Sequence, residues 1–114
     1  MIFVTGPLYA GKETYIRRAL GWDEADFRAR AVRDVQELVP CDDLAALADR
    51  LAARELVIAT ELGGGVVPVD AVTRRKREQA GRLACLLAAR ADTVIRVCCG
   101  LPQLLKGEGP GGCG

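Results

Sequence analysis

The sequence predicts an α/β domain of three layers, in which helices cover a small, mainly parallel sheet. Short apolar runs alternate with segments of helical periodicity along the 114 residues, a pattern typical of parallel strands joined by right-handed crossovers. The residues are 50% hydrophobic but only 4% aromatic, so we expect a core of alanine, leucine and valine. We assign one domain to residues 1–106 and a flexible, glycine-rich tail to residues 107–114.

The first half of the chain predicts one strand and two helices. Residues 1–5 (MIFVT) are apolar and rich in β-forming types, which favours a buried strand. After a glycine-bounded loop, a helix is expected over residues 12–20, with Gly21 as its stop, and Asp23 can open a short helix through Phe27. Residues 29–39 fit either a strand or a helix, and Pro40 ends that segment.

The second half predicts a helix, a strand, a long helix and a strand. Asp42 or Asp43 can cap a helix that runs to about residue 54, and a strand (ELVIAT) follows over residues 55–60. Asp70 can cap the longest helix, which runs to residue 90 and precedes a strand (TVIRVC) over residues 93–98. The inner face of the long helix is expected to carry Val72, Ala80, Leu83, Leu87 and Ala91.

The loop after the first strand has the spacing GxxxxGK, which is typical of a phosphate-binding loop. Its residues are Gly6, Pro7, Leu8, Tyr9, Ala10, Gly11 and Lys12. A strand delivers the chain into such a loop, whose N–H groups wrap a phosphate, and a helix then begins with its positive end facing the same phosphate. Lys12 would reach the terminal phosphates. The motif therefore predicts a P-loop (RecA-like) domain that binds a nucleoside triphosphate; the alternative is a glycine-bounded turn with an exposed lysine.

The residue after the lysine departs from this motif. A serine or threonine hydroxyl usually ligates Mg²⁺ there, but this chain has Glu13, and Thr14 lies one step, about 100°, further around the helix. A carboxylate can hold Mg²⁺ directly, since the ion prefers oxygen ligands, yet without a metal it would repel phosphates. The sequence thus supports phosphate binding more strongly than catalysis.

A second candidate site follows the strand over residues 55–60. Glu61 lies just past the carboxyl end of that strand, at the edge where parallel sheets place their ligands. The glycines that follow allow the backbone to approach a bound molecule closely, and Pro68 ends the run. The alternative for Glu61 is a solvated loop carboxylate. The residues assigned to this substrate or nucleotide loop are Glu61, Gly63, Gly64, Gly65 and Pro68.

Composition excludes several classes of function. A net charge of +1 argues against a nucleic-acid partner, since the one basic cluster, residues 74–77, is local. No apolar run reaches the roughly 18 residues of a membrane span, and no signal peptide is visible, so we expect a cytoplasmic protein. The five cysteines lack the spacing of a disulfide framework or a zinc site. There is no histidine, which removes histidine-based acid–base chemistry.

The two candidate sites, in this order, resemble the bifunctional adenosylcobinamide kinase/adenosylcobinamide-phosphate guanylyltransferase family. The family's phosphate loop reads TGGxxSGKS, and residues 5–13 read TGPLYAGKE. Its second motif reads NEVGxGIVP, and residues 60–68 read TELGGGVVP. A helix with RxxAGRxN and then ADxV follows in the family; here residues 77–84 read REQAGRLA and residues 91–94 read ADTV. The C-terminal match covers roughly residues 56–100 without an evident gap.

This resemblance implies a kinase that transfers the γ-phosphoryl group of ATP or GTP to the hydroxyl of adenosylcobinamide, a corrinoid. Lys12 and Glu61 would be its catalytic residues. The family also has a strand that ends in an acidic residue and helps to hold Mg²⁺, and Asp34 is the candidate for that acid here. Mg²⁺ would then be held by Glu13 or Thr14 together with Asp34.

The departures from the family are equally informative. Family members are considerably longer, and the segment shortened here carries the histidine that accepts the guanylyl group. Because this chain has no histidine, we expect the guanylyltransferase reaction to be absent. Two asparagines of the family motifs are replaced by Thr60 and Ala84.

The sequence is also compatible with two other functions. One is a catalytically impaired relative that binds a nucleotide or a partner and regulates corrinoid metabolism. The other is an interaction module in which the GxxxxGK segment is only a turn. A homo-oligomer is also expected, since a short parallel sheet can leave an edge that a second copy covers.

Overall fold

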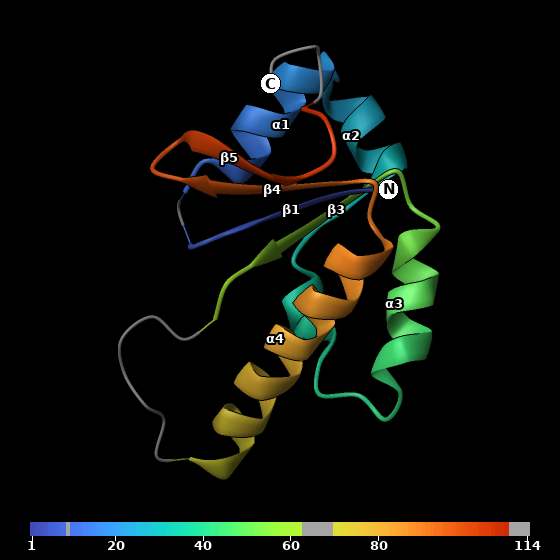
Figure 1. Cartoon of the computed structure of the whole chain (residues 1–114), viewed down its shortest axis with the longest axis vertical. Helices are drawn as coiled ribbons and strands as arrows, with labels where there is room; N and C mark the ends of the chain where they lie inside the picture. Colours follow the sequence, from blue (N-terminus) through green and yellow to red (C-terminus); the bar gives the residue numbers. More distant parts are fainter. Residues whose placement is uncertain (9, 63–69, 110–114) are drawn as a thin grey trace.

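A five-stranded sheet forms the middle layer of the domain (Figure 1). The computed structural model describes residues 1–8, 10–62 and 70–109. In these residues the strand order is β2-β3-β1-β4-β5; the first four strands are parallel, and β5 runs antiparallel to β4. The strands are β1 (Ile2–Gly6), β2 (Ala31–Val32), β3 (Leu56–Thr60), β4 (Thr93–Cys98) and β5 (Leu101–Lys106).

Two helices cover each face of this sheet, which confirms the predicted three-layer α/β fold (Figure 1). The helices are α1 (Lys12–Leu20) and α2 (Glu24–Arg30) on one face, and α3 (Leu44–Ala52) and α4 (Ala71–Arg90) on the other. A short 3-10 helix, η1 (Val35–Leu38), packs beside β3. None of the helices in the described part of the chain has the length and apolarity of a membrane span.

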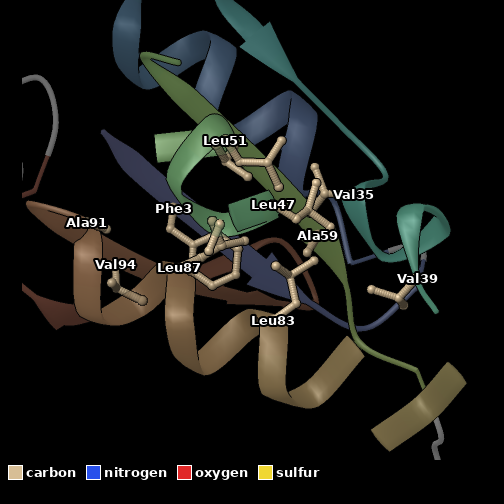
Figure 2. Close-up of a cluster of buried hydrophobic side chains, with 12 residues drawn as sticks. Phe3, Val35, Val39, Leu47, Leu51, Ala59, Leu83, Leu87, Ala91 and Val94 are labelled. Atoms are coloured by element: carbon tan, nitrogen blue, oxygen red, sulfur yellow. The ribbon is translucent and has the colours of Figure 1, made fainter. Parts of the chain in front are cut away.

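Strand β3 contributes side chains to two hydrophobic cores, one on each face of the sheet. Its residues alternate between the faces: Leu56 and Ile58 pack with α1 and α2, whereas Val57 and Ala59 pack with α3 and α4. Every residue of β3 before Thr60 is buried, as expected for a strand covered on both faces. In Figure 2, Leu83 and Leu87 project from α4 toward this strand.

The predicted helix boundaries are largely confirmed by their capping residues. Asp43, rather than Asp42, caps α3 by accepting a hydrogen bond from the Ala46 N–H group at 3.0 Å. Asp70 caps α4 by accepting from the N–H groups of Val72 and Thr73. At the end of α1, Gly21 has the left-handed conformation that commonly stops a helix.

Residues 29–39 combine the two structures that their sequence allowed. Helix α2 continues three residues past the predicted Phe27, strand β2 has only two residues, and η1 follows at once. Asp34 has a φ of 56°, a left-handed conformation that breaks both a strand and a helix. The segment therefore cannot be one regular element.

Two features of the C-terminal half differ from the prediction. Val72 was assigned to the inner face of α4, but it is 70% exposed, because the first turn of this helix lies beyond the sheet (Figure 1). Strand β5 was not predicted. It follows β4 through a two-residue turn, Cys99-Gly100, in which both residues have positive φ, as in a tight hairpin.

We predict that acid weakens the N-terminal end of α4. The Thr73 hydroxyl donates to Asp70 at 2.6 Å and, together with the backbone N–H groups, lowers the pKa of that carboxyl. A carboxyl with a lowered folded-state pKa contributes stability above its unfolded pKa of about 3.9 and loses it as the pH falls through the lowered value.

The measurement is helix content against pH by circular dichroism. Asp70→Asn keeps an accepting oxygen but does not titrate, so this variant should show a flatter profile than the wild type below about pH 4. Superimposable profiles would contradict this role of the Asp70 carboxylate.

Candidate functional site

The glycine-bounded loop begins where β1 ends and is held in place by the β4–β5 turn. Gly6 has a φ of 154°, and a Cβ atom at this position would lie 2.1 Å from the carbonyl oxygen of Val97. Further along, the carbonyl of Ala10 accepts a hydrogen bond from the N–H group of Gly100 at 2.7 Å. Both ends of the loop are therefore fixed against β4 and its turn. Tyr9 lies outside the described residues.

Lys12 is the first residue of α1, and its side chain is directed back against the loop. The residue is only 8% exposed, and its ammonium group donates to the carbonyl of Pro7 at 2.7 Å. Burial lowers the pKa of Lys12, whereas the charges of Asp34 and Glu61 oppose that shift. The three predicted site residues are thus close enough to interact electrostatically.

A pocket of about 310 Å³ lies beside this loop and brings the predicted metal ligands together. It is lined by Ala10, Gly11, Lys12, Glu13, Thr14, Arg33, Asp34, Ile58 and Thr60. The Glu13 carboxylate already pairs with the Arg33 guanidinium at 2.9 Å, and both groups are partly exposed. We refer to this space as the loop pocket.

The donor set of the loop pocket fits a magnesium ion. Mg²⁺ usually binds through one or two protein carboxylates and completes its octahedron with phosphate and water oxygens. Glu13, Thr14 and Asp34 line the same pocket, and their side chains carry two carboxylates and a hydroxyl. Within the described ranges, no group of three or more histidine, cysteine or acidic residues could hold a metal by itself. Phosphate oxygens would therefore have to complete the coordination.

Gln36 connects the Asp34 side of the loop pocket to the end of β3. Its side chain is buried, and its Oε1 atom accepts a hydrogen bond from the N–H group of Thr60 at 2.9 Å. Its Nε2 atom lies 3.4 Å from a carboxylate oxygen of Asp34, a long contact. A buried amide with partners on both sides limits how far the two segments can separate.

Glu61 is fixed by both its backbone and its side chain. Its N–H group donates to the carbonyl of Gly6 at 2.8 Å, one step past the end of the β1–β3 ladder. Two nitrogens of the Arg96 guanidinium contact the two carboxylate oxygens at 2.8 and 2.9 Å, and this pairing raises the pKa of Arg96. The other predicted residues of this loop, Gly63, Gly64, Gly65 and Pro68, lie outside the described residues.

Three residues around the site were not singled out from the sequence. Arg96 gave the clearest signal, because it is the one charged residue in the apolar run TVIRVC. Gln36 follows a valine in a segment of ambiguous structure, so the neighbouring sequence did not predict that its side chain is buried. Arg33 was visible only as a neighbour of Asp34, and its pairing with Glu13 spans 20 residues of chain.

Comparisons with known proteins agree on one family. The model of a family described as cobinamide kinase / cobinamide phosphate guanyltransferase matches residues 25–105. The chain is 40% identical to the bifunctional adenosylcobalamin biosynthesis protein CobP of Pseudomonas aeruginosa over 58 residues, 51% of this chain and 34% of the relative. It is 34% identical to the bifunctional adenosylcobalamin biosynthesis protein CobU of Salmonella typhimurium over 85 residues, 75% of this chain and 44% of the relative.

Two facts about these matches matter for the site. The chain spans less than half the length of both curated relatives. The residues matched by the family model include Asp34, Glu61 and Arg96, whereas the loop from Gly6 to Lys12 precedes the matched range.

Proposed function

This chain belongs to the cobinamide kinase / cobinamide phosphate guanyltransferase family, and on that premise we propose that it binds ATP or GTP and transfers the γ-phosphoryl group to the hydroxyl of adenosylcobinamide. The observation that carries the proposal is the loop from Gly6 to Lys12, which ends in a buried lysine beside the loop pocket. In a phosphate-binding loop, oriented N–H groups and a lysine stabilise the charge of a transferring phosphoryl group.

In the proposed reaction, Glu61, Arg96 and Lys12 each have a defined role. The acceptor oxygen forms a bond to the γ-phosphorus while the bond from that phosphorus to the β,γ-bridging oxygen breaks, and the nucleoside diphosphate leaves. The hydroxyl proton passes to the carboxylate of Glu61, which Arg96 holds in a fixed orientation. Lys12 balances the negative charge on the phosphates.

In this proposal Glu13 or Thr14 would hold Mg²⁺ together with Asp34 and the nucleotide. The ion supplies positive charge to the phosphate oxygens. Arg33 would compete with the metal for the Glu13 carboxylate, since the Arg33 and Glu13 side chains are paired at 2.9 Å. Nucleotide affinity should therefore depend on the magnesium concentration.

We further propose that this chain transfers no guanylyl group. The resemblance implies a histidine acceptor for that reaction, and the chain contains no histidine. Incubation with GTP labelled in the α-phosphate tests this point, and covalent labelling of the protein would contradict it.

The kinase proposal is tested by titration of ATP and GTP in the presence of Mg²⁺, followed by a phosphorylation assay on adenosylcobinamide. We expect binding of at least one nucleotide and formation of adenosylcobinamide phosphate. If neither nucleotide binds, the proposed function is wrong.

Restoring the usual hydroxyl at position 13 should improve the site. Glu13→Ser removes a negative charge next to the phosphates and supplies a magnesium ligand, so we expect affinity for the magnesium–nucleotide complex to rise by about tenfold. Glu24→Ser is the matched control, because Glu24 forms an exposed pair with Arg28 on α2. Equal affinities of Glu13→Ser and the wild type would show that Glu13 does not face the phosphates.

The ion pair between Glu13 and Arg33 favours a second candidate function, a nucleotide-binding relative without turnover that regulates corrinoid metabolism. In that case the wild type binds nucleotide but forms no phosphorylated corrinoid. Measurable turnover by the wild type rules this candidate out.

A further inference from the structure

A second pocket, of about 270 Å³, lies between η1, the end of β3 and α4. Its floor is apolar and buried, and is formed by Val35, Leu83 and Leu87 (Figure 2). Its polar lining includes Gln36, Thr60 and Glu61. Sites for small molecules usually have volumes of about 300–1,000 Å³, so this one has room for only part of a large molecule. We refer to it as the α4 pocket.

The α4 pocket is adjacent to the loop pocket, where the phosphates are proposed to bind. Thr60 lines both pockets. Glu61 lines the α4 pocket and is also close enough to Lys12 for its charge to oppose the lowering of the Lys12 pKa by burial. A hydroxyl group in the α4 pocket would thus lie next to a fixed carboxylate and near the predicted position of the γ-phosphate.

The wall that α4 contributes to this pocket includes three small residues, beside Arg77 and the floor residues Leu83 and Leu87. Ala80, Gly81 and Ala84 line it over little more than one helical turn. Gly81 lies in the middle of a 20-residue helix, where glycine is less stable than alanine. Its φ does not lie in the left-handed region, and among the described residues outside its own helical turn a Cβ atom there would have no neighbour within 4 Å. Neither the backbone conformation nor packing against the described residues therefore requires a glycine at this position.

Resting on the proposed function, we propose that the α4 pocket is the acceptor subsite and that Gly81 keeps it open. It takes a short aliphatic arm that ends in a hydroxyl group, and the body of the acceptor stays outside because a corrinoid ring is far larger than the pocket. The apolar floor contacts the carbons of the arm, and the hydroxyl donates to Glu61. The small residues on α4 leave space for the arm to enter.

The test places a larger side chain on α4 so that it fills the pocket. Acceptor binding is then measured separately from nucleotide binding. Adenosylcobinamide is titrated into the full chain saturated with a non-hydrolysable ATP analogue and Mg²⁺. Gly81→Leu should weaken corrinoid binding by at least about tenfold, the effect of overfilling a fitted site. The affinity for the ATP analogue should stay unchanged, and the urea midpoint should not fall.

The matched control is Cys85→Leu, which adds a similar side chain one turn later on an exposed part of α4, outside the pocket lining. Ala84→Leu reduces the space in the same pocket, and its corrinoid affinity is measured instead if Gly81→Leu does not fold. Retained nucleotide binding with unchanged corrinoid affinity in the pocket variants would overturn the acceptor subsite alone. A wild type that binds no nucleotide would overturn the proposed function, and the subsite with it.

Discussion

Replacing Gly6 by alanine is expected to lower the free energy of unfolding by roughly 3 kcal/mol, the upper end of the range for overpacking a buried position. The added methyl group would lie 2.1 Å from the backbone oxygen of Val97, and the φ of 154° is one that side chains rarely adopt. Since the clash is with backbone rather than with a flexible side chain, β1 and β4 would have to separate. Urea unfolding followed by circular dichroism measures the change.

Gly81→Ala is the matched control, and its expected effect on the free energy of unfolding has the opposite sign. A methyl group at position 81 would meet no other segment of the described structure within 4 Å, so the higher helix propensity of alanine should raise stability by about 1 kcal/mol. Equal urea midpoints for Gly6→Ala and the wild type would contradict the close approach of β1 and β4.

Replacing Lys12 by alanine should weaken nucleotide binding by about 10- to 100-fold. A hydrogen bond to a charged group contributes about 1.5–3 kcal/mol, and each 1.4 kcal/mol changes affinity tenfold. The 8% exposure of Lys12 and its contact with the Pro7 carbonyl hold the ammonium group against the loop before any ligand arrives. Calorimetric titration with ATP or GTP and Mg²⁺ measures the loss.

Lys106→Ala controls for the general loss of one positive charge. Lys106 lies at the opposite edge of the sheet, where it pairs with Val94 in the β4–β5 ladder, and its ammonium group donates to carbonyls at the end of α4. This variant should bind nucleotide as the wild type does. If Lys12→Ala binds nucleotide as well as the wild type does, the GxxxxGK segment is only a turn. That result would support the interaction-module hypothesis and contradict the kinase proposal.

Elements with local signals were predictable from the sequence. Helix α1 has the predicted bounds because a glycine precedes it and Gly21 stops it, and α4 begins after Asp70 because a carboxylate there caps two N–H groups. Strand β4 also has its predicted bounds, since an apolar run of β-branched residues has few alternatives between a helix end and a turn. In each case the decisive contacts are close in sequence.

The parts that escaped prediction depend on distant contacts or unusual backbone conformations. All six residues of β5 are exposed, so no pattern of buried residues marked the strand, and Cys99 takes a positive φ that asparagine or glycine usually takes. The motif placed Glu61 in the site, but its pairing with Arg96 could not be predicted from the sequence, because β1 lies between their strands. Long-range pairing of this kind follows only from the strand order.

The position of β1 in the middle of the sheet has a consequence for the order in which the chain can assemble. Ile2 pairs with Leu56 on one side and Thr93 on the other, and the Ala10 carbonyl finds its donor only at Gly100. Contacts between residues so far apart in sequence form slowly, because a long loop must close before they stabilise the chain. The loop after β1, which is synthesised before β4 and β5, therefore reaches its final shape only after the β4–β5 hairpin has followed.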